Sequence, residues 1–441
     1  MMHFFVHFNF FLQSFADRFF LMKPVHFIKV FWFFFIFDLP RYVLIDIVFI
    51  SVIIPIIHRE KTNRERFGKL LKFENPLVSV IIPGKNEGKG IRKCVLSLRE
   101  QTYKNLEIIV IDDGSDDNMR DQCNRLLREG LIDRYLRNEE RGGKASAANF
   151  GFRMSHGKYI VRMDADSSLD RDAIFNILTY FYDPKVGAVS GNVKVRNMYD
   201  NWITACQAIE YMKTVSMSRW EKAYLRILRI VSGAFGAFKR ELVEQIGGWD
   251  IGPGLDGDIT VKIMKTKNHV SFAHDAVCLT NAPTTLKALI NQRLRWNRSL
   301  IRMRLRKHRN VFAPEENFNI FLFLSVLDNI FFNLVLAVLW LIYHVVTIKN
   351  FPASFFNIIL MNLILYTMTN YIQFFIVWLI SERKREESRL FIFIPLMSVY
   401  LGYILRPVRL IAYFDELLFK SSYRDPWNPR KVSDIAKKLG F

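Results

Sequence analysis

Several features that mark common protein classes are scarce or missing in this 441-residue sequence. It has four cysteines, at positions 94, 123, 206 and 278, too few for a disulfide scaffold and too widely spaced for a zinc or redox motif. Neither Gly84–Gly90 nor Gly142–Lys144 has the spacing of a P-loop, which argues against a nucleoside triphosphatase. Acidic residues number 42 against 62 Lys and Arg, giving a formal charge of +20. That surplus predicts an anionic partner: nucleic acid, a membrane face or a phosphorylated substrate.

Apolar residues are abundant and gather at the two ends of the chain. They make up 51% of the sequence, with 40 Phe against 21 Gly, which excludes disorder for most of it. Residues 351–380 contain no charged side chain, and neither do residues 330–348 apart from His344. Both stretches exceed the roughly 18 residues that a membrane-spanning helix needs. Near the front, 43–57 is apolar except for Asp46, so membrane helices are expected at both ends.

Basic segments next to these runs predict the orientation in the membrane. The stretches after residue 57, over 293–310 and over 381–389 are rich in Lys and Arg and are expected to face the cytosol. Residues 4–22 are expected to form an amphipathic interfacial helix with Asp17 and Arg18 on its wet side. The segment 390–412 leaves two alternatives open. It crosses the membrane once, leaving the basic tail outside, or it bends back at Pro407.

The middle of the chain has the pattern of an α/β domain. Short Val/Ile-rich runs alternate with helical patterns, which predicts a parallel sheet covered by helices. The expected strands are Val78–Ile82, Leu106–Ile111, Tyr159–Met163 and Val186–Val193, and the expected helices include Ile91–Arg99 and Ala145–Met154. The expected organisation is N-terminal interfacial and transmembrane helices over 1–60, a catalytic domain over 61–290, an amphipathic interfacial helix over 291–317, a membrane channel region over 318–419 and a basic tail over 420–441.

Two motifs follow the first two expected strands and can hold a nucleotide. Asp112 and Asp113 end the run Leu106–Ile111, and ligands of open α/β sheets bind just past the carboxyl ends of strands. The alternative is that Asp-Gly-Ser there is only a turn. Gly142-Gly143-Lys144 opens a helix, where backbone amides and the lysine can meet phosphate oxygens.

Carboxylates follow in two further places. Asp164 and Asp166 come directly after an apolar strand, and such a pair suits Mg²⁺ bound to a diphosphate. The alternative is a solvated strand end with a helix cap. Asp256 lies at the start of an apparent helix and can act as a general base. Here the competing interpretation is helix capping by Asp258.

The last motif is Gln292-Arg293-Leu294-Arg295-Trp296. Arginines bind diphosphates in a bidentate manner, and an indole face stacks on sugar rings. The alternative is a basic interfacial helix with a Trp anchor.

The order and spacing of these five elements resemble the processive family 2 glycosyltransferases, membrane-embedded GT-A enzymes that include cellulose, hyaluronan and chitin synthases. The resemblance covers roughly residues 76–310, and QRLRW fits the family's Gln-x-x-Arg-Trp signature. It is nearest to the poly-β-1,6-N-acetylglucosamine synthases, on the stretches 187–192, 232–238 and 247–249. It implies a GT-A α/β domain inserted between N- and C-terminal transmembrane helices.

The resemblance implies roles for the donor side of the site. Asp113, with Asp112 beside it, would bind the uridine part of a UDP-sugar, and Lys144 would line the same nucleotide pocket. Asp164 and Asp166 would form the family's Asp-x-Asp pair, holding Mg²⁺ or Mn²⁺ on the diphosphate, with Asp166 most directly on the metal.

It also implies roles for the acceptor side. Asp256 aligns with the catalytic base of the family's Thr-Glu-Asp triplet, although Gly254 and Leu255 replace the Thr and Glu. The acceptor and the diphosphate would be bound by Gln292, Arg293, Arg295 and Trp296.

The expected function is inverting, processive transfer of a UDP-activated sugar, foremost UDP-N-acetylglucosamine, into a β-linked extracellular polysaccharide that passes through the enzyme's own membrane helices. Alternatives are a β-glucan synthase using UDP-glucose and a non-processive transferase acting on a lipid acceptor. The implied partners are the UDP-sugar, the growing polysaccharide, the bilayer and a small membrane accessory subunit. Nucleic acid is not expected, because the basic residues cluster beside membrane segments. The implied location is the inner (plasma) membrane, multi-pass, with the catalytic domain in the cytosol.

Overall fold

The computed structural model of the protein describes Phe15, Phe19 and residues 21–252, 254–313, 318–425 and 428–439, with residues 53–58 described by their backbone alone. The interfacial helix expected over residues 4–22 therefore lies largely outside the described residues, as do Asp17 and Arg18.

The centre of the molecule is an eight-stranded sheet in the order β3-β2-β1-β4-β7-β6-β8-β5. All four expected strands are confirmed, each ending within two residues of its predicted end. The strand bounds are β1 Val78–Gly84, β2 Leu106–Asp112, β3 Arg134–Arg137, β4 Tyr159–Met163, β5 Ser168–Leu169, β6 Val186–Val195, β7 Phe235–Lys239 and β8 His269–Thr280.

The expectation of a purely parallel sheet is wrong. Strands β1, β2, β3 and β4 pair in parallel, as do β6 and β8, but β7 runs antiparallel to both of its neighbours, β4 and β6. After β6 the chain forms several helices before it returns to the sheet. It then enters β7 at the end of the sheet where β4 and β6 finish. The carboxyl ends of β1, β2 and β4 still meet at one edge, where the predicted motifs lie.

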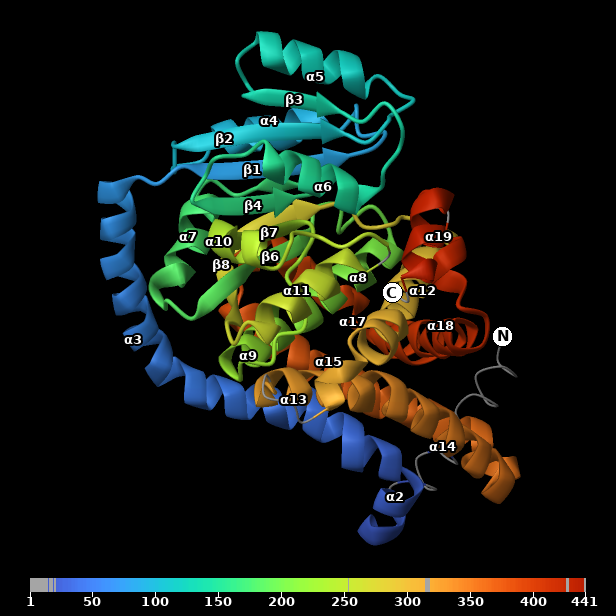
Figure 1. Ribbon diagram of the computed structural model, residues 1–441. Coiled ribbons are helices and arrows are strands. Elements are labelled where there is room, and N and C mark those ends of the chain that lie inside the picture. Colours follow the sequence, from blue (N-terminus) through green and yellow to red (C-terminus); the bar gives the residue numbers. More distant parts are fainter. Residues whose placement is uncertain are drawn as a thin grey trace.

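Helices cover both faces of this sheet and complete a three-layer domain (Figure 1). The two expected helices are confirmed as α4 and α6. One apolar cluster lies between the sheet and α4, α5, α7 and α8, and the other packs α6, α10 and α11 on the opposite face. The bounds are α4 Ile91–Arg99, α5 Met119–Arg128, α6 Lys144–Arg153, α7 Ala173–Thr179, α8 Trp202–Tyr211, α9 Ser218–Tyr224, α10 Arg240–Gln245, α11 Leu255–Lys265 and α12 Leu286–Leu300.

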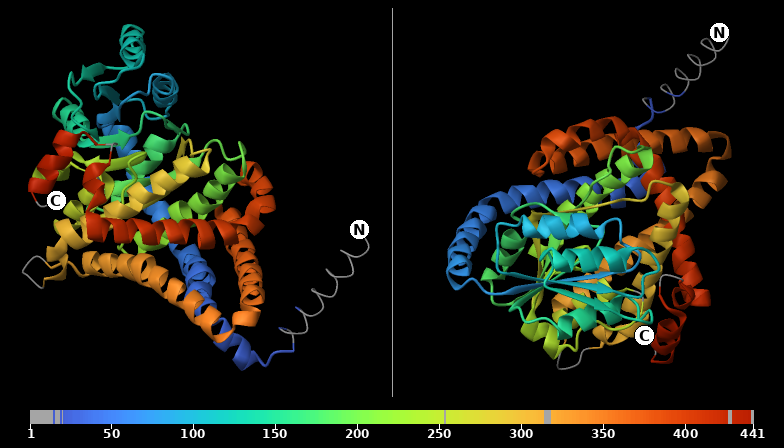
Figure 2. Two further views of the ribbon diagram at one scale, coloured as in Figure 1. Left: turned by 90° about the vertical axis from the view of Figure 1, so that its right-hand side faces the viewer. Right: turned by 90° about the horizontal axis from the view of Figure 1, so that it is seen from above.

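A layer of long helices lies beneath the domain (Figure 2). Within the described part of the chain, three helical runs are long and apolar enough to cross a membrane: Ile320–Asn350, Pro352–Ile380 and Lys384–Phe419. At the N-terminal side, α3 is one helix from the apolar segment to the edge of the sheet, and it passes through the boundary expected at residue 60. The remaining helices are α2 Pro24–Val30, α3 Ile45–Glu74, α13 Ile320–Asn329, α14 Leu336–Asn350, α15 Phe355–Ile380, α16 Lys384–Glu387, α17 Ile394–Val399, α18 Arg406–Phe419 and α19 Arg430–Lys438.

The last apolar run does not break at Arg406-Pro407. Pro407 lies in the first turn of α18, directly after the π-helical stretch Tyr400–Leu405, and the helix continues to Phe419. Along its length this run contacts the α/β domain: Glu387 pairs with Lys194 of β6, and Tyr400 donates a hydrogen bond to Glu210 of α8.

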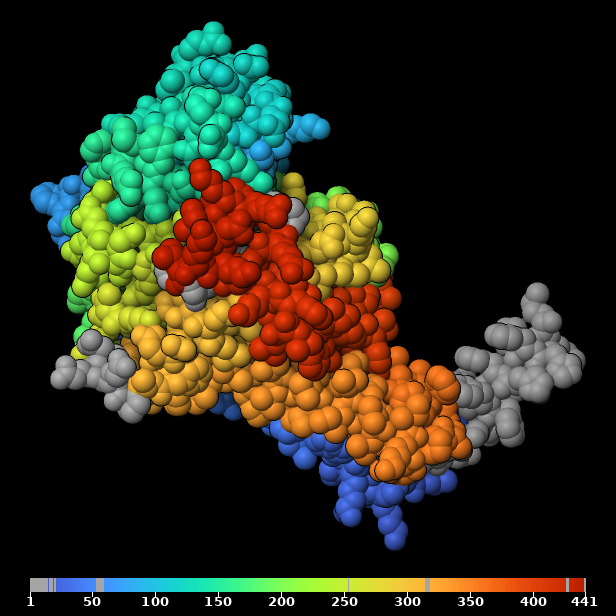
Figure 3. Space-filling model, turned by 45° about the vertical axis from the view of Figure 1, so that its right-hand side comes forward, coloured from blue at the N-terminus to red at the C-terminus, as the bar shows by residue number. Residues whose placement is uncertain are grey.

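The chain then turns at Lys420 and returns to the α/β domain. Lys420 ends α18 in the left-handed conformation, at the boundary expected between 419 and 420. The following segment lies over the face between the sheet and the helical layer, where Figure 3 shows it in red. Helix α19 therefore lies on the same side of the apolar layer as the sheet.

Candidate active site

Asp112 is an internal anchor of the loop after β2. Its buried carboxylate accepts hydrogen bonds from the Ser115 backbone N–H at 2.8 Å, from Tyr135 at 3.0 Å and from Arg137 at 2.6 Å. These bonds hold the loop against β3. The structure thus places Asp112 in the wall of the expected nucleotide site, with its side chain turned into the protein.

Asp113 joins that loop to the glycine-rich segment. Its Oδ1 accepts from Asn138 at 2.9 Å and from the Gly142 N–H at 2.8 Å, and its Oδ2 accepts from the Gly143 N–H at 2.8 Å. Gly143 has φ +85°, a conformation that favours glycine. Asp113 therefore fixes the start of α6, and with it the position of Lys144.

Lys144 extends from the first turn of α6 to the end of β4. Its Nζ lies 2.6 Å from Oδ1 of Asp164, and both side chains are about one third exposed. This ion pair joins Gly142-Gly143-Lys144 to the Asp-x-Asp motif at one edge of the sheet. Lys144 and Asp164 are twenty residues apart in the sequence.

A concentration of carboxylates lies beside this pair. Burial and the charge of Asp164 raise the pKa of Asp166 above its ordinary value. Burial, with the charges of Asp166 and Asp164, raises the pKa of Glu87 to about 7. Sequence reasoning missed Glu87, although it follows β1 at the edge where Asp113 and Asp164 lie.

These carboxylates fit a divalent cation. Burial and the charges of neighbouring carboxylates raise their pKa values, and a bound cation would oppose both effects by favouring the ionised forms. No set of three His, Cys, Asp or Glu side chains within the described part of the chain is arranged to enclose an ion by itself. Two carboxylates completed by substrate phosphates is the arrangement that Mg²⁺ commonly takes.

Asp256 lies in the first turn of α11. Gly254, which directly precedes the helix, has a φ of +90°. Its Oδ1 accepts a hydrogen bond of 2.5 Å from Arg162 of β4, while 31% of the side chain stays exposed. Burial alone would raise the pKa of Asp256, but Arg162 and Lys144 outweigh it and hold the pKa below its ordinary value. Asp256 is therefore a carboxylate in the neutral pH range.

Asp258 does not cap this helix. It is buried and accepts from His308 at 2.6 Å and from Lys307 at 2.8 Å. These bonds tie α11 to the basic segment that follows α12.

The four predicted residues of α12 separate into two groups. Arg293 is 7% exposed, forms a 2.8 Å ion pair with Glu210 and lies 4.5 Å over the ring of Trp296. Burial lowers the pKa of Arg295, and the charges of Asp425, Asp164 and Asp256 act against this effect. Arg293 therefore supports Trp296 from inside the protein, and Arg295 is the arginine of this motif whose charge interacts with the site carboxylates.

Gln292 and Trp296 have the features of binding groups. The Gln292 Oε1 is buried and has no hydrogen-bond partner within the described residues, so it can accept from a bound hydroxyl. The Trp296 ring is 41% exposed beside Arg293.

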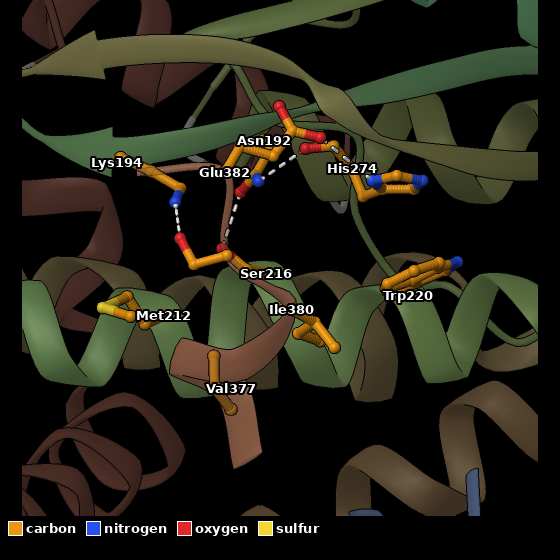
Figure 4. Close-up of a pocket in the computed structure, with 10 residues that line it drawn as sticks. Asn192, Lys194, Met212, Ser216, Trp220, His274, Val377, Ile380 and Glu382 are labelled. Carbon is orange, nitrogen blue, oxygen red and sulfur yellow. Dashed lines mark hydrogen bonds and ion pairs between the residues drawn. The ribbon is translucent and has the colours of Figure 1, made fainter. Parts of the chain in front are cut away.

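Two hollows lie away from these motifs. One, at the junction of β6, β8 and the end of α15, is lined by Asn192, Ser216, Trp220, His274 and Glu382 (Figure 4). Its polar groups are joined to each other, since Asn192 bonds to Ser216 and to the carbonyl of His274. It contains none of the predicted site residues. The other lies among the apolar helices and is lined by polar and aromatic side chains, including Trp340, Tyr343, Asn362, Tyr366 and Thr369.

Comparison with known proteins identifies relatives of the α/β domain. Residues 79–247 match the family described as Glycosyl transferase family 2. The chain is 31% identical over 214 residues to poly-beta-1,6-N-acetyl-D-glucosamine synthase from Staphylococcus aureus (strain COL), covering 48% of this chain and 51% of that protein. It is 29% identical over 222 residues to the protein of that name from Staphylococcus epidermidis, covering 50% and 53%. The chain thus spans about half the length of the curated relatives it matches.

Among solved structures, a mannosyltransferase from Pyrobaculum calidifontis, in complex with GDP-Man and Mn²⁺, superposes with a TM-score of 0.53 at 20% identity. The match covers 84% of this chain and 99% of that one. It confirms the expected fold class, a GT-A α/β domain combined with flanking apolar helices. Residues 79–247, which hold Asp112, Asp113, Lys144, Asp164 and Asp166, are thus similar to glycosyl transferase family 2.

Proposed function

We propose that the protein is an inverting, processive glycosyltransferase that polymerises a UDP-activated sugar, UDP-N-acetylglucosamine, into a β-linked polysaccharide. One arrangement carries the proposal: Lys144 pairs with Asp164, and Arg162, two residues before Asp164 in the same strand, hydrogen-bonds to Asp256, so the expected donor site and the expected base lie together. The names of the curated relatives, poly-beta-1,6-N-acetyl-D-glucosamine synthases, support the choice of sugar.

The donor would lie along the carboxyl ends of β1, β2 and β4. Asp113 and its glycine loop would contact the uridine part, with Asp112 supporting the loop. Lys144 and Arg295 would bind the diphosphate. Asp164 and Asp166 would hold Mg²⁺ or Mn²⁺, and a bound cation would neutralise charge on the departing diphosphate.

Asp256 would act as the general base. Its Oδ1 is engaged by Arg162, and its Oδ2 accepts no hydrogen bond within the described residues, which leaves that oxygen for the acceptor proton. The acceptor oxygen forms a bond to the anomeric carbon as its proton passes to Asp256. The bond from that carbon to the diphosphate oxygen breaks, and UDP leaves with the electron pair. One displacement inverts the anomeric configuration, so an α-linked donor gives a β-linked product.

The acceptor would enter past α12. Trp296 offers an exposed indole face for a sugar ring, and Gln292 offers a buried acceptor for a hydroxyl. Arg293 would keep Trp296 in place from behind.

The helical layer would hold and pass the product. Polar and aromatic groups such as Trp340, Tyr366 and Asn370 line a hollow between the apolar runs, and polar side chains are costly in lipid unless they serve a site or a path. We place the protein in the plasma membrane as a multi-pass enzyme with its sheet in the cytosol. Because Lys384–Phe419 contacts the α/β domain along its length, the tail that follows lies on the cytosolic side as well.

A donor panel tests the proposal. The full-length protein in lipid nanodiscs is mixed with each of UDP-N-acetylglucosamine, UDP-glucose and UDP-galactose, with and without Mn²⁺, and UDP release and product length are measured. Turnover with UDP-N-acetylglucosamine into long β-linked chains supports it. Turnover with UDP-glucose identifies a β-glucan synthase, single-sugar transfer to a lipid identifies a non-processive enzyme, and no UDP release refutes the proposal. Added membrane extract tests the need for an accessory subunit.

A further inference from the structure

The carboxylate of Asp256 is held from two sides. Arg162 Nη1 donates to Oδ1 at 2.5 Å. On the other side is Gly233, where a Cβ atom would lie 2.3 Å from Oδ2 and 2.7 Å from Oδ1. Contacts shorter than 3.0 Å require something to move, so only a glycine admits this carboxylate where it lies.

Arg162 is an unusual residue for its place in the fold. It lies in β4, two residues before Asp164, and is 2% exposed. Arginine is almost never fully buried unless all its donors are paired. Among the residues that the structure describes, its side chain hydrogen-bonds to Asp256, and Nε and Nη2 have no hydrogen-bond partner. Stability alone does not account for a buried cation with unused donors, which suggests a function.

The other cations near Asp256 are engaged elsewhere. Lys144 pairs with Asp164 at 2.6 Å, and Arg219 donates to Ser190 at 3.3 Å. Arg295 is acted on by Asp425 and Asp164 as well as by Asp256. Within the described residues, Arg162 is therefore the side chain that hydrogen-bonds to the Asp256 carboxylate. The adjacent Leu255 is largely buried and brings no charge.

We propose that Arg162 is a positioning residue that fixes the Asp256 carboxylate over Gly233, so that Oδ2 is the oxygen presented to the acceptor hydroxyl. The inference rests on the proposed function, because it assigns Arg162 a role through the base of that reaction. It adds a residue that none of the sequence motifs contains.

Kinetics of Arg162→Lys and Arg162→Gln test the inference, with UDP release measured across pH on the UDP-sugar that the wild type turns over. We expect kcat to fall at least tenfold in R162Q, less in R162K, with KM for the donor changed by less than threefold. The acid limb of the kcat profile moves to higher pH in R162Q, because the charge that favours ionised Asp256 is gone. Arg64→Lys is the control, because Arg64 forms a 2.5 Å ion pair with Asp275 and touches none of the proposed site residues. The dependence of kcat on pH in R64K should match that of the wild type.

The outcomes separate this inference from the proposed function. If R162Q keeps the wild-type kcat and pH profile while Asp256→Asn is inactive, the positioning role is refuted and the base assignment stands. If D256N turns over normally, the base assignment itself fails. A second measurement needs no turnover: the melting temperatures of the wild type, R162Q, D256N and the double variant are compared at pH 7. We expect the change in the double variant to differ from the sum of the changes in the two single variants, and a change equal to that sum overturns the inference.

Discussion

Arg293 and Glu210 form a buried ion pair of 2.8 Å that joins α12 to α8 behind the ring of Trp296. Two residues further on, the charge of Arg295 interacts with Asp164 and Asp256. One motif thus combines an arginine held in a buried ion pair with an arginine that interacts electrostatically with the site carboxylates.

Variants of these two arginines should fail in different ways. Arg293→Gln leaves the Glu210 carboxylate buried without its partner, which typically costs about 3–5 kcal/mol of stability. We expect a melting temperature lower by several degrees in nanodiscs. Arg295→Gln should melt near the wild-type temperature and lose at least tenfold in kcat. Equal melting temperatures for the two variants would contradict the assignment of a stabilising role to Arg293 alone.

Gly233→Ala should disable the enzyme without unfolding it. The new methyl group would lie 2.3 Å from Asp256 Oδ2 and push the carboxylate away, so we expect a kcat loss of about 100-fold, the size that a 1 Å misplacement can cause. Donor KM should change little. The matched control is Gly257→Ala in the same region, where a Cβ meets nothing within 4 Å. It should keep activity and gain up to ~1 kcal/mol of helix stability. An active G233A would place the base elsewhere.

Cation binding should depend on pH through Glu87 and Asp166. Both pKa values are raised, so both groups lose their protons at higher pH than ordinary carboxyls do, and Glu87 becomes charged near pH 7. Their mutual repulsion then lowers the stability of the cation-free protein, because the folded state loses protons that the unfolded state has already released. We expect Mn²⁺ to raise the melting temperature more at pH 8 than at pH 5.5.

Glu87→Gln should reduce this pH dependence. Glu129→Gln, which removes an exposed pair with Arg92 remote from the site, is the control and should behave as the wild type. A Mn²⁺ effect that is equal at both pH values in the wild type would argue against a cation on these carboxylates.

Two acids of α11 should give opposite phenotypes although they are two residues apart. Asp256→Asn keeps its size and should retain donor binding while polymer formation stops. Asp258→Asn loosens the bonds to His308 and Lys307 and should lower the melting temperature instead. Isothermal titration with UDP and UDP-release assays distinguish the two. Near wild-type polymer synthesis by D256N would show that Asp256 is not the base.

Much of the fold could be predicted from local patterns. The strands β1, β2 and β4 have short Val/Ile-rich runs that are followed by Pro83, Asp112 and Asp164, so their bounds were predictable. Strand β7 was not recognised, because Phe235–Lys239 is short and contains Gly and Ala. Its antiparallel place between β4 and β6 depends on pairing with residues far away in the chain.

The site was predictable only in outline. Motifs at the ends of neighbouring parallel strands must meet at one edge, which explains why Asp113, Lys144 and Asp164 were expected together. The roles of Arg293 and Arg295 could not be told apart from composition. Two helical residues at i and i+2 lie about 200° apart around the axis, so they face different surroundings. Arg162 resembles an ordinary strand residue until its pairing with Asp256 is seen.

The run Lys384–Phe419 contacts three elements at once: β6 through Glu387, α8 through Tyr400 and α12 through Asp415, which pairs with Arg298 at 2.6 Å. Through these contacts, a tilt imposed on the run by a thinner or thicker bilayer would be passed to the helix that bears Trp296. We therefore expect the lipid surroundings to tune the geometry of sugar transfer mechanically, without any ligand acting as messenger.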